Sequence, residues 1–168
     1  NDTGRSLFGS NNGDVIIGGA GSDNLYGYIG SDTLTGGGGN DALYGGEGDD
    51  LYVFGNDFSL SASGDVVNEN SYGGAGTDTI WLTNGVVLDD FYSWTDSSGY
   101  LWLQNRTDGV SNTLKVYGTY SASLGVDVGS YVEYITFDDE TTWDLTAGLH
   151  LKNNNTARTL YGSAENDI

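Results

Sequence analysis

The sequence of 168 residues contains no cysteine, one histidine (His150), and five basic side chains against 24 acidic ones, which gives a formal net charge of −19. Without cysteine there is no disulfide, and with a single histidine a zinc or copper site has almost no ligands to use. Nucleic acid is not an expected partner, because phosphate neutralisation requires clustered Lys and Arg. No apolar run is long enough to span a bilayer, so we expect no membrane insertion.

Glycine and aspartate are abundant, and they recur with a fixed period. Residues 18–53 consist of four nonapeptides of the form G-G-x-G-x-D-x-U-x, in which U is a large apolar residue. A weaker copy precedes them at 9–17, and a displaced copy follows at 73–81. A flexible glycine linker has no reason to keep Asp at every ninth position with an apolar residue two places later. The pattern is typical of a parallel β-roll whose turns bind calcium.

Each nonapeptide divides into a six-residue turn and a three-residue strand, and two nonapeptides make one coil. Turns that are 18 residues apart in the sequence should therefore stack directly. We expect an all-β fold: a right-handed parallel β-roll (solenoid) capped by a small C-terminal β-domain. The eighth-position side chains alternate with outward neighbours and should fill the core; they are Ile16, Leu25, Leu34, Leu43 and Tyr52.

Stacking also gathers the sixth-position aspartates into two columns. Adjacent strands lie about 4.8 Å apart, so one cation can bridge two stacked turns. Carboxylates and backbone carbonyls are hard oxygen ligands, and flexible glycine turns suit the larger, looser shell of Ca²⁺ better than that of Mg²⁺. We expect roughly three to five calcium ions. The candidate ligands are Asp14, Asp32 and Asp50 in one column, Asp23 and Asp41 in the other, and Asp65 and Asp78 in the later, irregular copies.

The acidic charge has a consequence for folding. Without cations the stacked carboxylates repel one another and oppose compaction. Calcium binding should therefore be coupled to folding, and we expect the calcium-free roll to be largely disordered.

The two ends of the chain resemble each other. Residues 1–15 and 154–168 align at an offset of 153, with seven identical positions that include Arg5/Arg158 and Asp14/Asp167. We interpret this as the start of a second copy, which makes the chain one unit of about 153 residues in a tandem array. Neighbouring copies in the parent chain would then be its partners, and the unit itself is expected to be a monomer.

Beyond the repeats, glycine becomes rarer and aromatic residues become frequent. We expect four to six strands there, including Tyr100–Gln104, Thr113–Tyr117 and Tyr131–Phe137, because these segments are rich in β-branched and aromatic residues. An exposed last coil would present unpaired backbone groups, so these strands should cap it. The expected organisation is a linker at 1–8, the calcium-binding roll at 9–81, the cap at 82–151, and at 152–168 a linker with the start of the next unit.

No arrangement of residues indicates catalysis, so we expect that the chain is not an enzyme. The acidic pairs Asp89-Asp90 and Asp138-Asp139 consist of neighbours, which point to opposite faces of a strand and do not converge on a substrate. Two functions stay open: a structural calcium module, and an adhesion module that binds polysaccharide or ice. The second would need a regular outward row of Thr or aromatic residues, and the seventh and ninth positions show no regular Thr array.

The repeats resemble those of the repeats-in-toxin (RTX) family. The region 82–147 is similar to the haemolysin-type calcium-binding-associated domain that follows such repeats. The motifs that match the family include 50–55 (DLYVFG) and 76–80 (GTDTI) in the repeats and 132–137 (VEYITF) in this region. Two departures are Glu140, where the family has a turn glycine, and Asn12 at the fourth position of the first copy, which would weaken its site.

The resemblance implies export by a type I machine as an unfolded chain, folding in external calcium, and a secreted or cell-surface location. It also implies that turn carbonyls ligate calcium together with the aspartates. These carbonyls belong to Gly18, Gly19, Ala20, Gly21, Gly27, Ile29, Gly30, Gly36, Gly37, Gly38, Gly39, Gly45, Gly46, Glu47 and Gly48.

Overall fold

The structure is a computed structural model, and it describes residues 3–55, 64–69, 75–85, 91–95, 100–105, 113–117 and 132–145. These segments contain thirteen β-strands and no helix. None of these described segments contains a helix that is long and apolar enough to span a membrane.

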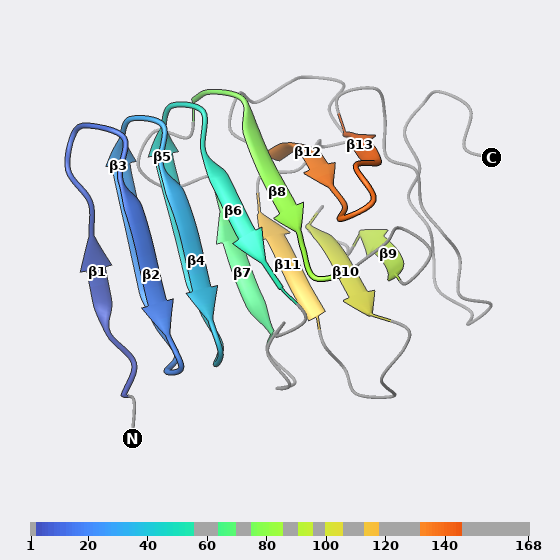
Figure 1. The fold of residues 1–168 in the computed structure, drawn as a ribbon, viewed down its shortest axis with the longest axis horizontal. Coiled ribbons are helices and arrows are strands. Elements are labelled where there is room, and N and C mark those ends of the chain that lie inside the picture. The colour runs from blue at the N-terminus through green and yellow to red at the C-terminus, as the bar shows by residue number, and fades with distance from the viewer. Residues whose placement is uncertain are drawn as a thin grey trace.

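The strands form two sheets, and successive strands of the repeats alternate between them (Figure 1). Parallel neighbours within a sheet are thus separated in sequence by a strand of the other sheet, as in a roll. The seven-stranded sheet contains, in spatial order, β1 (Ser6–Phe8), β3 (Asn24–Ile29), β5 (Ala42–Glu47), β7 (Asp65–Asn68), β11 (Thr113–Tyr117), β10 (Leu101–Asn105) and β9 (Phe91–Thr95). The six-stranded sheet contains β13 (Thr142–Asp144), β12 (Val132–Thr136), β8 (Asp78–Leu82), β6 (Leu51–Phe54), β4 (Thr33–Gly37) and β2 (Val15–Gly19).

The register confirms the predicted stacking of turns. Leu25 pairs with Leu43, and Ile16 pairs with Leu34, each 18 residues ahead. Between later coils the separation grows to 24 and then to 28 residues, as the hydrogen bonds between the stacked turns show. The enlarged turns are therefore absorbed without loss of the parallel pairing.

The predicted inward positions form the core. Leu25, Leu34, Leu43 and Tyr52 are fully buried, and Ile16 in the first coil is 8% exposed. Their neighbours on the strands face outward, as Val15 at 75% exposure illustrates. The same apolar cluster continues without a break through the residues that follow the repeats, as far as Leu145.

The strands are longer than the expected three residues, because they run into the first glycines of the next turn. β3 and β5 each have six residues. The chain then turns at the second and fourth positions of the repeat, where φ is positive. At the second position φ is 94° for Gly37 and 110° for Gly46. Tyr28 occupies the same position with φ 81°, a conformation that costs a non-glycine residue about 1–2 kcal/mol.

Both ends of the roll differ from the expected boundaries. β1 lies within the predicted linker 1–8, yet it pairs with β3 in parallel, so the roll begins there. At the other end, β11 pairs in parallel with β7, and β12 pairs in parallel with β8. The region expected to fold over the end of the roll instead extends both of its sheets, because a parallel strand satisfies the unpaired N–H and C=O groups of the last coil.

Five strands, β9–β13, lie in the region expected to contain four to six. Three of them match the predicted segments to within one residue at each end. Glu140, the departure from a turn glycine, has φ 64°, so its turn requires a conformation that favours glycine. The chain also turns after β8, where φ is positive at both Asn84 and Gly85.

Candidate metal centre

The sixth-position aspartates form two hydrogen-bonded ladders. In each ladder, the backbone N–H of one residue donates to Oδ1 of the aspartate in the next stacked turn. The donor–acceptor distances are 2.7 Å from Asp14 to Asp32 and 2.8 Å from Asp32 to Asp50. The full ladders are Asp14, Asp32, Asp50, Asp78 and Glu133 on one side, and Arg5, Asp23, Asp41 and Asp65 on the other.

Only one oxygen of each carboxylate serves the ladder. The second oxygen, Oδ2, of Asp23, Asp32 and Asp50 is buried and has no hydrogen-bond partner. A buried charged oxygen without a partner is strongly unfavourable, so it requires either a cation or a proton. These orphaned oxygens fit a metal ion, and the donor set consists of oxygen atoms.

The first-position glycines complete this environment. A Cβ added to Gly18 would lie 2.8 Å from Oδ2 of Asp23, and a Cβ added to Gly27 would lie 2.6 Å from the Gly45 carbonyl oxygen of the next stacked turn. A carboxylate oxygen and a carbonyl oxygen thus face the space that a side chain would fill. Glycine is required at this position because any Cβ would take that space.

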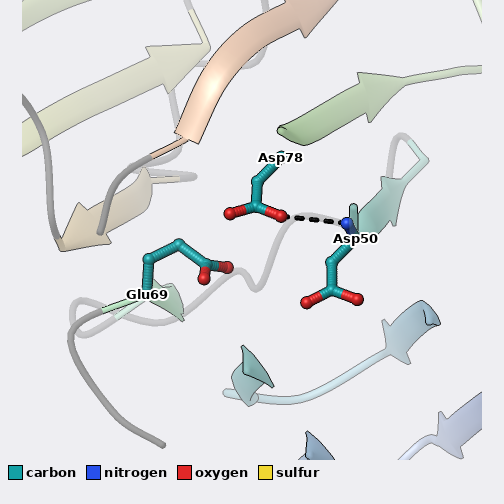
Figure 2. A group of neighbouring side chains, drawn as sticks. All are labelled: Asp50, Glu69 and Asp78. Carbon is teal, nitrogen blue, oxygen red and sulfur yellow. Dashed lines mark hydrogen bonds between the residues drawn. The ribbon is translucent and has the colours of Figure 1, made fainter. Parts of the chain in front are cut away.

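A third group of acidic side chains lies where the regular repeats end. One carboxylate oxygen from each of Asp50, Glu69 and Asp78 lies within 4.8 Å of the others, and all three residues are buried. Figure 2 shows the Glu69 carboxylate directed toward the two aspartates, while Asp78 accepts the ladder hydrogen bond from the Asp50 backbone N–H. Tyr52 Oη donates to Glu69 Oε1, and the Gly45 N–H donates to Tyr52 Oη at 2.8 Å.

The repeat sequence, the ladders and the orphaned oxygens agree with a family match. Residues 8–43, 17–52, 26–59 and 63–86 match the family of RTX calcium-binding nonapeptide repeats. The chain carries four copies of this RTX repeat. Calcium is therefore the cation of these turns, and the ladder aspartates with the neighbouring turn carbonyls are the groups that would hold it.

Two solved structures resemble the chain over most of its length. The AlgE6R3 subunit from the Azotobacter vinelandii mannuronan C5-epimerase is 24% identical with a TM-score of 0.54, covering 99% of this chain and 91% of that one. The AlgE6R2 subunit of the same enzyme is 25% identical with a TM-score of 0.50, covering 82% and 92%. Both likenesses support the β-roll fold. No curated protein matches the sequence.

The two ladders begin differently. Arg5 holds the ladder position nine residues before Asp14: its backbone N–H donates to Asp23 Oδ1, and its guanidinium group donates to the Gly18 carbonyl oxygen. A side-chain cation thus lies at the end of this column. In the other column, Oδ2 of Asp14 accepts hydrogen bonds from Ser10 N (2.6 Å) and Ser10 Oγ (2.8 Å). The first turn therefore holds one oxygen of its carboxylate with its own hydrogen bonds.

Burial changes the acidity of the ladder carboxylates. Desolvation is the main cause that raises the pKa of Asp32, and it raises the pKa of Asp50 to about 7, with further contributions from neighbouring negative charges. Desolvation, followed by the charges of Asp78 and Asp50, also raises the pKa of Glu69. The pKa of Asp78 is raised as well, again mainly by desolvation. The shared cause is that burial disfavours the ionised form of each carboxyl group.

All seven predicted aspartates lie in the ladders, and all but Asp14 are buried. Among the predicted carbonyl ligands, those of Gly19 and Glu47 accept backbone hydrogen bonds from the stacked turn at 2.7 Å, so stacking already uses one of their lone pairs. The predicted set omits Arg5, Glu69 and Glu133. Arg5 lies one repeat period, nine residues, before Asp14, and Glu69 lies four residues after Asp65, at the first position of the next turn. The repeat spacing could therefore have indicated both residues. No sequence signal marks Glu133.

The acidic pair Asp138-Asp139 forms hydrogen bonds within and between turns. Asp138 Oδ2 accepts a hydrogen bond from Gly85 N at 2.6 Å. Asp139 Oδ1 accepts hydrogen bonds from the backbone N–H and the hydroxyl group of Thr141. Both carboxylates thus stabilise turns. The pair Asp89-Asp90 and His150 lie outside the described residues.

Proposed function

We propose that this RTX module is a calcium-folded structural unit of a larger exported bacterial protein. The chain stays loose where calcium is scarce and folds into the roll where calcium is plentiful. It carries no catalytic activity of its own. It is secreted or displayed at the cell surface, and it is followed by further copies of itself at intervals of about 153 residues, as the similar ends of the sequence suggest.

The observation that carries this proposal is the amount of negative charge buried inside the roll. Six ladder aspartates and Glu69 are at most 2% exposed. Within the described part of the chain the basic residues are Arg5 and Lys115, and Lys115 lies over the rings of Tyr100 and Trp102. Two unit charges about 4.8 Å apart repel by about 3 kcal/mol at an effective dielectric constant near 20. A few such pairs equal the whole stability of a typical domain.

The extracellular location follows from the same dependence on calcium. Extracellular calcium modules bind with dissociation constants of about 10⁻⁴ to 10⁻³ M, far above the calcium concentration of a cytosol. A chain that requires calcium to fold therefore remains unfolded before export and folds after it. This order is the one an unfolded export substrate needs.

The test is a calcium titration of the purified chain, followed by far-UV circular dichroism and tryptophan emission, with magnesium as the control. We expect a cooperative gain of β signal at about 0.1–1 mM calcium, and no such gain with magnesium at the same concentration. A chain that is already folded in chelator and indifferent to calcium would refute the proposal.

A second candidate function, polysaccharide binding, is favoured by one observation. Phe8, Tyr26 and Tyr44 stack in a row on the outer face of the seven-stranded sheet, with ring centroids 5.1 Å and 4.8 Å apart. Phe8 is 62% exposed. Flat aromatic rows suit stacking against sugar rings, and the similar solved structures belong to an enzyme named for mannuronan. The chain's charge of −19 favours a neutral polysaccharide over an anionic one.

This candidate is tested by calorimetry with a soluble neutral β-glucan and with mannuronan, both in calcium. We expect Tyr26→Ser to weaken binding of the neutral glucan. The matched control is Ile17→Ser, which changes an exposed apolar residue on the other sheet. Absence of binding to either polysaccharide, or equal loss in both variants, would rule out the aromatic row as a binding surface.

A further inference from the structure

The position of Glu69 is unlike that of any first-position residue in the regular turns. In the register that pairs Leu43 with Val67, Glu69 lies beside Gly45 of the preceding coil. The regular repeats have glycine at this position. A Cβ at Gly45 would collide with Oδ2 of Asp50 and with the hydroxyl group of Tyr52. The turn that begins at Glu69 reaches its aspartate, Asp78, after nine residues rather than five. Glu69 thus places a side chain at the position where the regular turns have room only for glycine, and its interval to the next aspartate is longer than theirs.

The side chain of Glu69 is held in one orientation. Its Oε1 accepts the hydrogen bond from Tyr52 Oη, and that hydroxyl group is itself fixed by the Gly45 N–H. Its Oε2 is buried and has no hydrogen-bond partner, and the same is true of Oδ2 of Asp50. Glu69 has no exposed surface at all. Two orphaned oxygens from different turns are therefore held in a space that water does not reach.

The charge of this cluster distinguishes it from the regular turns. A regular turn presents one aspartate together with glycine backbone, whereas here three carboxylates converge within 4.8 Å. Of the described basic residues, Arg5 pairs with Asp23 and Lys115 lies over the rings of Tyr100 and Trp102. Three carboxylates at this spacing are compatible with burial when a divalent cation lies among them, since the cation offsets most of their charge. Their oxygens are the ligands that calcium prefers.

We propose that Glu69 joins the ladder aspartates Asp50 and Asp78 in one calcium site, built mainly from side chains, that differs from the turn sites of the regular repeats and binds more tightly than they do. The proposal rests on the proposed calcium-dependent folding and adds to it a third carboxylate ligand that the repeat pattern does not contain. The greater number of charged ligands raises the affinity. This site would fill first, at the coil where the repeats meet β8 and the strands beyond it.

The test measures bound calcium per chain by equilibrium dialysis and elemental analysis, with a calorimetric titration for affinity. The variant is Glu69→Gln, which keeps the shape and removes one charge. The matched control is Glu140→Gln, which makes the same exchange at an exposed turn. We expect Glu69→Gln to bind one ion fewer than the wild type, or to weaken the tightest phase by about tenfold or more, with no change in the control.

An unchanged ion count and unchanged tightest phase in a folded Glu69→Gln variant would overturn the proposal and would mean that the three carboxylates share protons instead. Should that variant fail to fold in calcium, Tyr52→Phe provides the answer, because it keeps every carboxylate and removes only the hydroxyl group that orients Glu69. We then expect Tyr52→Phe to bind as many calcium ions as the wild type, with the affinity of its tightest calcium-binding phase lowered by about tenfold. An unchanged affinity in that phase would overturn the proposal.

These outcomes are distinct from failure of the proposed function. That failure is read from the wild type alone, as a chain already folded in chelator. A wild type that folds with calcium, combined with an unaltered Glu69→Gln titration, retains the proposed function and rejects the three-carboxylate site.

Discussion

Two adjacent glycines in one turn should respond oppositely to alanine. Gly37 has φ 94°, and a Cβ there would lie well inside van der Waals contact of the Gly19 carbonyl oxygen in the stacked turn. Gly38 has no such restriction, and the nearest atom to its added Cβ is the Ala20 Cα at 3.9 Å. Gly37→Ala should therefore destabilise the roll, while Gly38→Ala should not.

The magnitudes follow from the geometry. The left-handed conformation costs alanine about 1–2 kcal/mol at Gly37. Relief of the clash separates the two turns and weakens the hydrogen bond from Gly38 N to Gly19 O, now 2.7 Å, which contributes about 1 kcal/mol. Gly38→Ala lowers the entropy of the unfolded chain and should stabilise by about 0.4–1 kcal/mol. The two variants should thus differ by about 2–4 kcal/mol in free energy of unfolding.

The assay is urea unfolding in saturating calcium, followed by tryptophan emission, for the wild type and both variants. Equal destabilisation by both substitutions would show that the turn tolerates no added methyl group anywhere. Two neutral substitutions would show that stacked turns are not in close contact. Either result would refute the argument from backbone conformation and turn stacking.

The remaining predictions concern charge and packing. In chelator, lowering the pH from about 8 to about 5 should increase the β signal in far-UV circular dichroism. The pKa of Asp50 is raised to about 7 in the folded state, so the folded state binds protons more tightly than the unfolded state and loses stability as the pH rises through that value. An unchanged signal would contradict the burial of ionisable carboxylates. The same protons compete with calcium, so the calcium midpoint should rise as the pH falls. Arg5→Gln should lower the free energy of unfolding by about 1 kcal/mol or less, since the pair with Asp23 Oδ1 at 3.7 Å is half-exposed on the arginine side, and urea titration at low and high salt measures it. Leu34→Ala should cost about 2–5 kcal/mol in saturating calcium because the side chain is fully buried, and a loss below about 1 kcal/mol would show that the core is loosely packed.

Much of the site could be read from the sequence because the repeat makes it local. Once two nonapeptides form a coil, the eighth residue faces inward and the sixth residue stacks on its equivalent 18 positions later. Leu34 and Asp32 obey this rule in the structure. The choice of calcium also follows from the residues alone, because the turns offer oxygen ligands and almost no nitrogen or sulfur.

The aromatic row shows how easily a pattern is missed when it is read in chain order. Tyr26 and Tyr44 hold the ninth position in alternate repeats, and Ile17 and Thr35 hold it in the repeats between. Listed consecutively, the ninth positions look irregular. Sorted by sheet, Phe8, Tyr26 and Tyr44 pair with one another in register and stack.

The sequence by itself determined the repeating part of this protein: the roll, its inward residues, its ladder aspartates and its cation. A fixed period converts local spacing into spatial stacking, so no long-range information is needed. Tertiary structure decided how the strands beyond the period pair. The pairing of β12 with β8 brings Glu133 to Asp78 across 55 residues, and Glu69 lies close to Asp50 and Asp78. Insertions break the period, and only the pairing of distant strands then decides which carboxylates meet.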